Sequence, residues 1–77
     1  MVGAYILIQT KVGLGSDITR EVMNVDGVSS AQAVTGPYDV IVYAEGRNLD
    51  ALSKSVVGKI QQIEGISRTL TCPVVHF

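Results

Sequence analysis

The chain has 77 residues and a formal net charge of −1, and 47% of its residues are hydrophobic against 17% charged. This length fits one domain, residues 1–77, and a chain so short buries only about 60% of its unfolded surface, so self-association is expected to stabilise it. The basic residues form no run, which argues against direct nucleic-acid binding, because such surfaces cluster Lys and Arg to neutralise phosphates.

The first half of the chain predicts a strand, a helix and a second strand. Val2–Lys11 is rich in β-branched and aromatic residues, which is typical of a strand. Residues 16–25 have apolar side chains at helical spacing, with Ser16 placed as the N-cap. Gly27 ends this helix, and the run Val28–Val34 predicts the second strand.

The second half predicts the same order of strand, helix and strand. Val40–Ala44 predicts a nearly apolar strand, and Asn48 is placed to cap a helix whose apolar residues recur as far as Ile63. Gly65 ends that helix, and Ile66–Val75 predicts the last strand. The order β-α-β-β-α-β is that of a ferredoxin-like sandwich, an α+β fold with two helices on one face of a four-stranded antiparallel sheet.

Several of these strands are apolar on both faces. The first strand places Tyr5 opposite Ile6, and the last places Val75 and Phe77 opposite Leu70. An antiparallel sheet with one face in water should alternate apolar and polar residues, and two helices cover only one face. We therefore expect the second face to pair with the same face of another copy, giving a homodimer.

Catalytic and metal-binding chemistry have little support in the sequence. The single histidine, His76, lies next to the C-terminus, whereas a general base must be held in position. The single Cys72 is expected to be a small core residue, and a lone thiol fits a reducing cytoplasm. No metal-ligand spacing occurs, so no cofactor is expected. No apolar segment approaches the ~20 residues that span a bilayer, and a cytoplasmic location is expected.

The segment between the second and third strands carries more polar chemistry than a turn requires. Gly36 permits a positive φ and Pro37 fixes φ, so the pair predicts a tight hairpin turn. Such a turn needs neither an acid nor a phenol, which makes Asp39 and Tyr38 candidates for binding. The alternative that Asp39 only satisfies amides of the turn stays open.

Two threonines of the last strand are candidates for the same site. Thr69 and Thr71 share one face of the strand, within the apolar surface that is expected to meet another subunit. Buried hydroxyls need partners, so a small zwitterion between subunits would fit. Asp39 and carbonyl oxygens would bind its ammonium group, and N–H groups near Gly36 with the threonine hydroxyls would bind its carboxylate.

These motifs resemble a known family. Gly36-Pro37-Tyr38-Asp39, Ile63-Glu64-Gly65-Ile66 and Arg68-Thr69-Leu70-Thr71 are similar, in order and spacing, to the effector-binding (RAM) domain of the Lrp/AsnC family, and the resemblance covers essentially the whole chain. Domains of that family pair through their sheets, and the dimers form rings with ligand between dimers. The resemblance implies an amino-acid sensor whose contacts would be Gly36, Tyr38, Asp39, Thr69 and Thr71.

The resemblance also implies partners. Full-length regulators of this family carry an N-terminal helix-turn-helix, whereas this chain begins at Met1 just before its first strand. That start favours a stand-alone domain over an excised one. The implied assembly is a homodimer that builds an octamer or decamer, and it could also mix with full-length Lrp/AsnC regulators.

Two alternatives stay open. Small dimeric ferredoxin-like domains include cofactor-free monooxygenases and isomerases, although acid–base groups are scarce on this sheet. Stabilisation by a ligand without turnover would separate a binding domain from such an enzyme. The other alternative is a structural assembly domain without a ligand, which no amino acid would stabilise.

Overall fold

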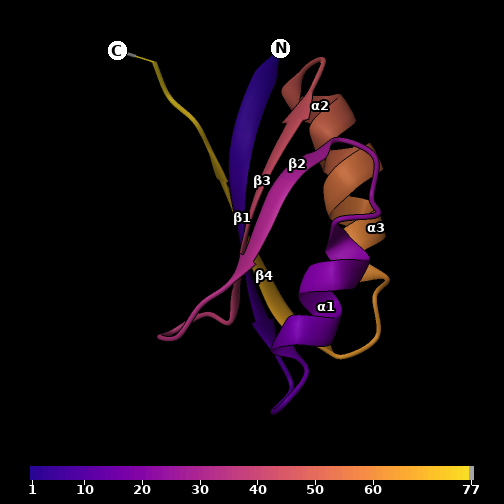
Figure 1. The fold of residues 1–77 in the computed structure, drawn as a ribbon. Coiled ribbons are helices and arrows are strands. Elements are labelled where there is room, and N and C mark those ends of the chain that lie inside the picture. Colours follow the sequence, from indigo (N-terminus) through magenta and orange to yellow (C-terminus); the bar gives the residue numbers. More distant parts are fainter. Residues whose placement is uncertain (77) are drawn as a thin grey trace.

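Four strands form a single antiparallel sheet in the computed structural model, which describes residues 1–76. The strands β1 (Val2–Thr10), β2 (Val28–Ala33), β3 (Val40–Gly46) and β4 (Ile66–Pro73) lie in the order β2-β3-β1-β4. β1 therefore pairs with both β3 and β4, and the two ends of the chain meet in the sheet. This topology, with helices on one face (Figure 1), confirms the predicted ferredoxin-like α+β fold.

Two helical segments cover one face of the sheet (Figure 1). The first is α1 (Gly15–Val22). The second is continuous and consists of α2 (Leu49–Leu52), a π-helical turn over Ser53–Val57 and α3 (Gly58–Gln61). A π-helical turn holds one more residue than an α-helical turn, so it rotates the positions that follow it.

Only one of the two predicted helix caps is present. The Asn48 Oδ1 accepts a hydrogen bond from the N–H of Ala51 at 2.8 Å, as predicted for an N-cap asparagine. The prediction for Ser16 was wrong, because α1 already begins at Gly15 and its N-cap position is Leu14, which makes no side-chain cap.

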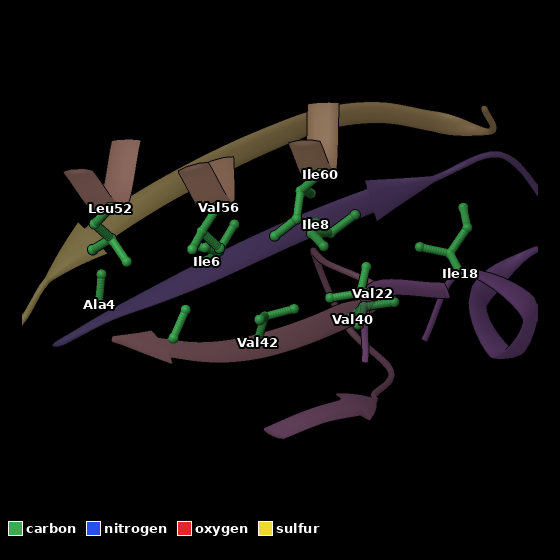
Figure 2. Close-up of a cluster of buried hydrophobic side chains, with 11 residues drawn as sticks. Ala4, Ile6, Ile8, Ile18, Val22, Val40, Val42, Leu52, Val56 and Ile60 are labelled. Carbon is green, nitrogen blue, oxygen red and sulfur yellow. The ribbon is translucent and has the colours of Figure 1, made fainter. Parts of the chain in front are cut away.

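The core lies between the two central strands and the helices (Figure 2). Alternate residues of β1 and β3 point toward the helices, and within residues 1–76 every buried side chain is apolar. Truncation of a fully buried leucine such as Leu52 to alanine costs about 2–5 kcal/mol in comparable cores. The buried residues are Ala4, Ile6, Ile8, Ile18, Val22, Val40, Val42, Ala44, Leu52, Val56 and Ile60.

The two junctions between helix and strand are built alike. Gly27 and Gly65 have φ angles of +97° and +98°, in the left-handed region that favours glycine. A Cβ atom would lie 2.7 Å from Val56 Cγ2 at Gly27 and 2.7 Å from Leu14 Cδ1 at Gly65. Each glycine thus supplies both the reversal of the chain and the space for a neighbouring side chain.

The face of the sheet opposite the helices, which we call the open face, is also apolar at its centre. The rings of Tyr5 and Tyr43 lie side by side on it, with centroids 5.0 Å apart. Tyr5 is 48% exposed and Leu70 is 43% exposed, which is unusual for large apolar side chains in mid-strand. The centre of this face, the open-face patch, consists of Tyr5, Leu7, Ile41, Tyr43 and Leu70.

Cys72 belongs to this face as well, so the prediction that it is a core residue was wrong. It pairs with Tyr5 on the open face and is exposed. The prediction for Phe77 lies outside the described residues. Within residues 1–76, no helix combines the length and the apolar character needed to cross a membrane.

Candidate functional site

The connection between β2 and β3 is a loop over residues 34–39 rather than the predicted tight turn. The N–H of Val34 donates to the carbonyl of Asp39 at 2.8 Å, which closes the base of the loop. Gly36 has a φ of +133°, as the prediction of a glycine-dependent reversal requires. The loop projects away from the helices, on the side of the open face (Figure 1).

Asp39 fixes this loop to the end of β1. Its backbone N–H donates to the carbonyl of Ile8 at 2.8 Å, and its Oδ2 accepts from the N–H of Thr10 at 2.8 Å. The alternative that Asp39 satisfies amides of the turn was therefore wrong, because the backbone amide that its side chain accepts from belongs to β1. Among residues 1–76, nothing donates a hydrogen bond to the other oxygen, Oδ1, which remains able to accept one from a ligand.

The other loop candidates lie next to Asp39. Tyr38 is half-buried and Gly36 is exposed. The carbonyl of Pro37 accepts a hydrogen bond from Gln9 Nε2 at 3.4 Å, so a side chain of the open face contacts the loop. Sequence reasoning missed Gln9, whose signal is a polar residue at the end of an otherwise apolar strand face.

Thr69 and Thr71 lie on the side of the sheet that carries the helices. They pair with Ile8 and Ile6, which point into the core, and Thr69 Oγ1 accepts a hydrogen bond from Gln61 Nε2 at 3.2 Å. The expectation that they belong to the apolar face meeting another subunit was therefore wrong. The register of β4 against β1 decides their direction, and alternation along β4 alone does not reveal it.

Within one chain, the threonines are not brought together with the loop. β1 separates β4 from β3, and the loop projects away from the helices that Thr69 and Thr71 face. Because β4 is an edge strand, its half-buried threonines are nevertheless accessible to a molecule that approaches this edge. A site with all five predicted residues requires two copies of the chain.

The surface near the loop does not enclose a ligand by itself. A hollow lined by Ala33, Val34 and Thr35 adjoins the loop and opens widely to solvent. Sites for small molecules bury most of the ligand surface, so a site here needs a second molecule to close it. In the described part of the chain, no group of three or more His, Cys, Asp or Glu side chains converges as metal ligands do.

Several solved structures share this fold. The protein TTHA0845 of Thermus thermophilus is 25% identical with a TM-score of 0.91, and the alignment covers 100% of this chain and 96% of that one. Escherichia coli AsnC is 30% identical with a TM-score of 0.87, over 99% of this chain and 52% of that one.

A curated relative and a family model identify the family of the chain. An uncharacterised helix-turn-helix transcriptional regulator of Pyrococcus furiosus is 24% identical over 71 residues, which are 88% of this chain and 47% of the regulator. The chain thus spans about half the length of the curated relative it matches. Residues 3–76 match the family described as the Lrp/AsnC ligand binding domain. The chain therefore belongs to the Lrp/AsnC family, as the ligand-binding domain of that family.

Proposed function

We propose that this domain binds an amino acid, or a closely related small metabolite, between subunits of a homo-oligomer and thereby regulates assembly. The observation that carries the proposal is the match of residues 3–76 to a ligand-binding domain of transcriptional regulators. A regulator of Neisseria meningitidis, NMB0573, solved in complex with L-Met, has the same fold, with a TM-score of 0.83 and 21% identity over 97% of this chain and 50% of that one.

The proposed site combines two copies of the chain. One copy contributes Gly36, Tyr38 and Asp39 from its loop, and a neighbour contributes Thr69 and Thr71 from the free edge of β4. The unused Oδ1 of Asp39 supports this arrangement, because a carboxylate oxygen is a strong acceptor for an ammonium group. The open hollow beside the loop supports it too, because a neighbour would close that hollow.

The proposed dimer forms through the open-face patch. Tyr5 and Leu70 are about half exposed in one chain and the rest of the patch is partly buried, and a two-fold copy would bury the patch against itself. Dimers would then meet through the loops and the β4 edges, giving a ring such as an octamer or decamer. A ligand that binds only where two dimers meet shifts the equilibrium toward the ring.

The domain is proposed to act by binding and not by catalysis. The matched family is a ligand-binding domain, and the Pyrococcus furiosus relative is a transcriptional regulator. Regulation through mixed assembly with full-length Lrp/AsnC proteins is part of the proposal, because the chain shares the fold of the ligand-binding half of such proteins. Exchange of subunits through the open-face patch would give mixed assemblies of this domain and full-length regulators.

A thermal-shift screen with the twenty amino acids, run beside native mass measurement, tests this function. We expect one amino acid, or a few of similar shape, to raise the melting temperature and to increase the mass of the assembly. A chain that no amino acid stabilises would be a structural assembly domain instead. Consumption of a stabilising compound would point to an enzyme.

A further inference from the structure

Three polar residues follow one another in a row across the end of the sheet next to the loop. On β1, Gln9 follows Ile8 and pairs with Arg68 of β4. On the other side of β1, Asp39 directly precedes Val40, which is the partner of Ile8 on β3. Asp39 forms hydrogen bonds with Ile8 and Thr10, which flank Gln9, so the order across the sheet is Asp39, Gln9, Arg68. Gln9 and Arg68 lie at the margin of the open-face patch.

Regular pairing with β1 as far as Gln9 places Arg68 on the open face. The register of β4 against β1 shifts by one residue between the pair Gln9–Arg68 and the pair Thr10–Ile66. Ile66 packs against the core, and Thr69 accepts a hydrogen bond from a side chain of α3, so both face the helices. Arg68, which pairs with Gln9, faces the opposite side.

Both charges of the row are available to a ligand. Within residues 1–76, Arg68 is exposed and makes no salt bridge, in contrast to Arg20, which pairs with Asp17 on α1. Asp39 uses only its Oδ2 within the described chain. Neighbouring strands lie about 4.8 Å apart, so the backbones that carry the acid and the arginine are roughly 10 Å apart across β1. Two side chains that extend toward each other over this distance can hold a small zwitterion.

We propose that Arg68 binds the α-carboxylate of the amino acid whose ammonium group is bound by Asp39. The proposal rests on the function proposed above and adds a residue to that site. A guanidinium group presents paired N–H donors that match the two oxygens of a carboxylate. Gln9 lies between the two charges, where its hydrogen bond to the Pro37 carbonyl keeps the loop against the row.

This assignment gives the carboxylate a charged partner on the same chain as Asp39. Thr69 and Thr71 face the helices of their own chain, so they can contribute only from a neighbour. Arg68 needs no neighbour, because it lies across β1 from Asp39 at the same end of the sheet of its own chain. The neighbouring threonines then close the site around the part of the amino acid that is not held by the row.

The test compares Arg68→Gln with Arg47→Gln, which removes the same charge at the other end of the sheet. Arg47 follows Gly46, the partner of Val2 at the start of β1. The probes are the amino acid that gives the largest shift in the screen and its α-carboxamide, which is neutral where the acid is charged. Calorimetric titration measures the affinity of wild type and both variants for each probe.

We expect Arg68→Gln to weaken binding of the free amino acid about tenfold or more, as loss of a charge-assisted hydrogen-bonded pair does, and to leave the amide within about twofold. Arg47→Gln should bind both probes as wild type does. Arg68→Lys should give an intermediate loss, because it keeps the charge without the paired donors, and it carries the test if Arg68→Gln does not fold.

The outcomes separate this inference from the proposed function. If wild type binds the amino acid and Arg68→Gln binds it equally well, the inference is overturned and the function stands. An equal loss for acid and amide overturns it too, because the arginine then does not recognise the carboxylate. If wild type binds none of the twenty amino acids, both the function and the inference fall.

Discussion

The carboxylate of Asp39 accepts a hydrogen bond from Thr10 through one oxygen and keeps the other free of partners within the described chain. Substitutions separate these two roles. Asp39→Ala removes both, and we expect it to lower the free energy of unfolding by about 1–2 kcal/mol, because a half-buried amide loses a charged acceptor. Asp39→Asn keeps an oxygen for the Thr10 amide but loses the charge that an ammonium group requires.

We therefore expect Asp39→Asn to unfold in urea close to wild type and to bind the amino acid at least about tenfold more weakly. Urea unfolding and calorimetric titration of both variants check this expectation. Wild-type affinity in Asp39→Asn would exclude the aspartate from the site. An equal loss of stability in both variants would show that the charge itself holds the loop to β1.

Gly3 is a second residue whose replacement has a defined consequence. A Cβ atom at this position would overlap the hydroxyl of Tyr43 and lie 2.8 Å from its Cζ atom. In Gly3→Ala the ring must leave its place over β1, which disturbs the open-face patch more than the core on the other side. We expect weaker dimerisation with a nearly unchanged melting temperature of the separated chain, measured by sedimentation and calorimetry. An unchanged dissociation constant would place Tyr43 outside the interface.

At the scale of elements, periodicity was sufficient to locate all four strands and both helical segments. Apolar spacing reports which face of an element is buried, and in this chain it predicted buried positions such as Ile18, Val22 and Ile60 correctly. It does not report the register between strands. The register of β4 against β1 is a long-range property, and it decides where Thr69 and Arg68 point.

The candidate site was predictable only in part for the same reason. Gly36, Tyr38 and Asp39 can be identified from the sequence alone, because a turn that needs only the glycine also carries a phenol and an acid. The contacts of Asp39 with β1 and of Gln9 with Pro37 join residues 28 or more positions apart, so local pattern does not reveal them. The prediction for Cys72 was wrong because both faces of this sheet carry apolar residues. Apolar neighbours in the sequence therefore do not show which face the cysteine lies on.

The junction between the last helix and β4 permits a sharp test of element geometry. Gly65→Ala forces a Cβ into the left-handed region and against Leu14, so we expect a loss of about 1–3 kcal/mol in unfolding free energy. Gly15→Ala is the matched control, because nothing lies within 4 Å of its added Cβ. Since alanine favours helix, we expect Gly15→Ala to gain up to about 1 kcal/mol. Urea unfolding of both variants measures the difference, and equal stabilities would contradict the role of Gly65.

For the whole molecule, the open-face patch predicts a subunit interface. Leu7 lies in the middle of it, between Ile41 of β3 and Leu70 of β4. Leu7→Lys would place a charge in a surface that a second copy desolvates, which is costly without a partner. We expect this variant to sediment as a monomer at micromolar concentration. Val12→Lys, at a fully exposed loop position, should assemble as wild type does.

Two results would contradict this interface. Leu7→Lys that still dimerises would place the contact elsewhere on the surface. Leu7→Lys that unfolds even at high protein concentration and low temperature would show that Leu7 belongs to the core of its own chain. The helix side already holds a closed apolar core without it, so we expect a folded but less stable monomer.

The amino acid should also control how dimers combine. If neighbouring threonines complete the site, the ligand binds assembled chains more tightly than separate dimers, and it stabilises the assembly by RT ln(1 + [L]/Kd) per site. At a hundred times Kd this is about 2.7 kcal/mol, or roughly a hundredfold in the association constant. By reciprocity, the affinity for the amino acid should rise with protein concentration. Sedimentation across a protein dilution series, with and without the amino acid, measures both effects. If the distribution of masses is the same in both series while the ligand is bound, the row of Asp39, Gln9 and Arg68 holds it within one chain and the neighbour contributes nothing.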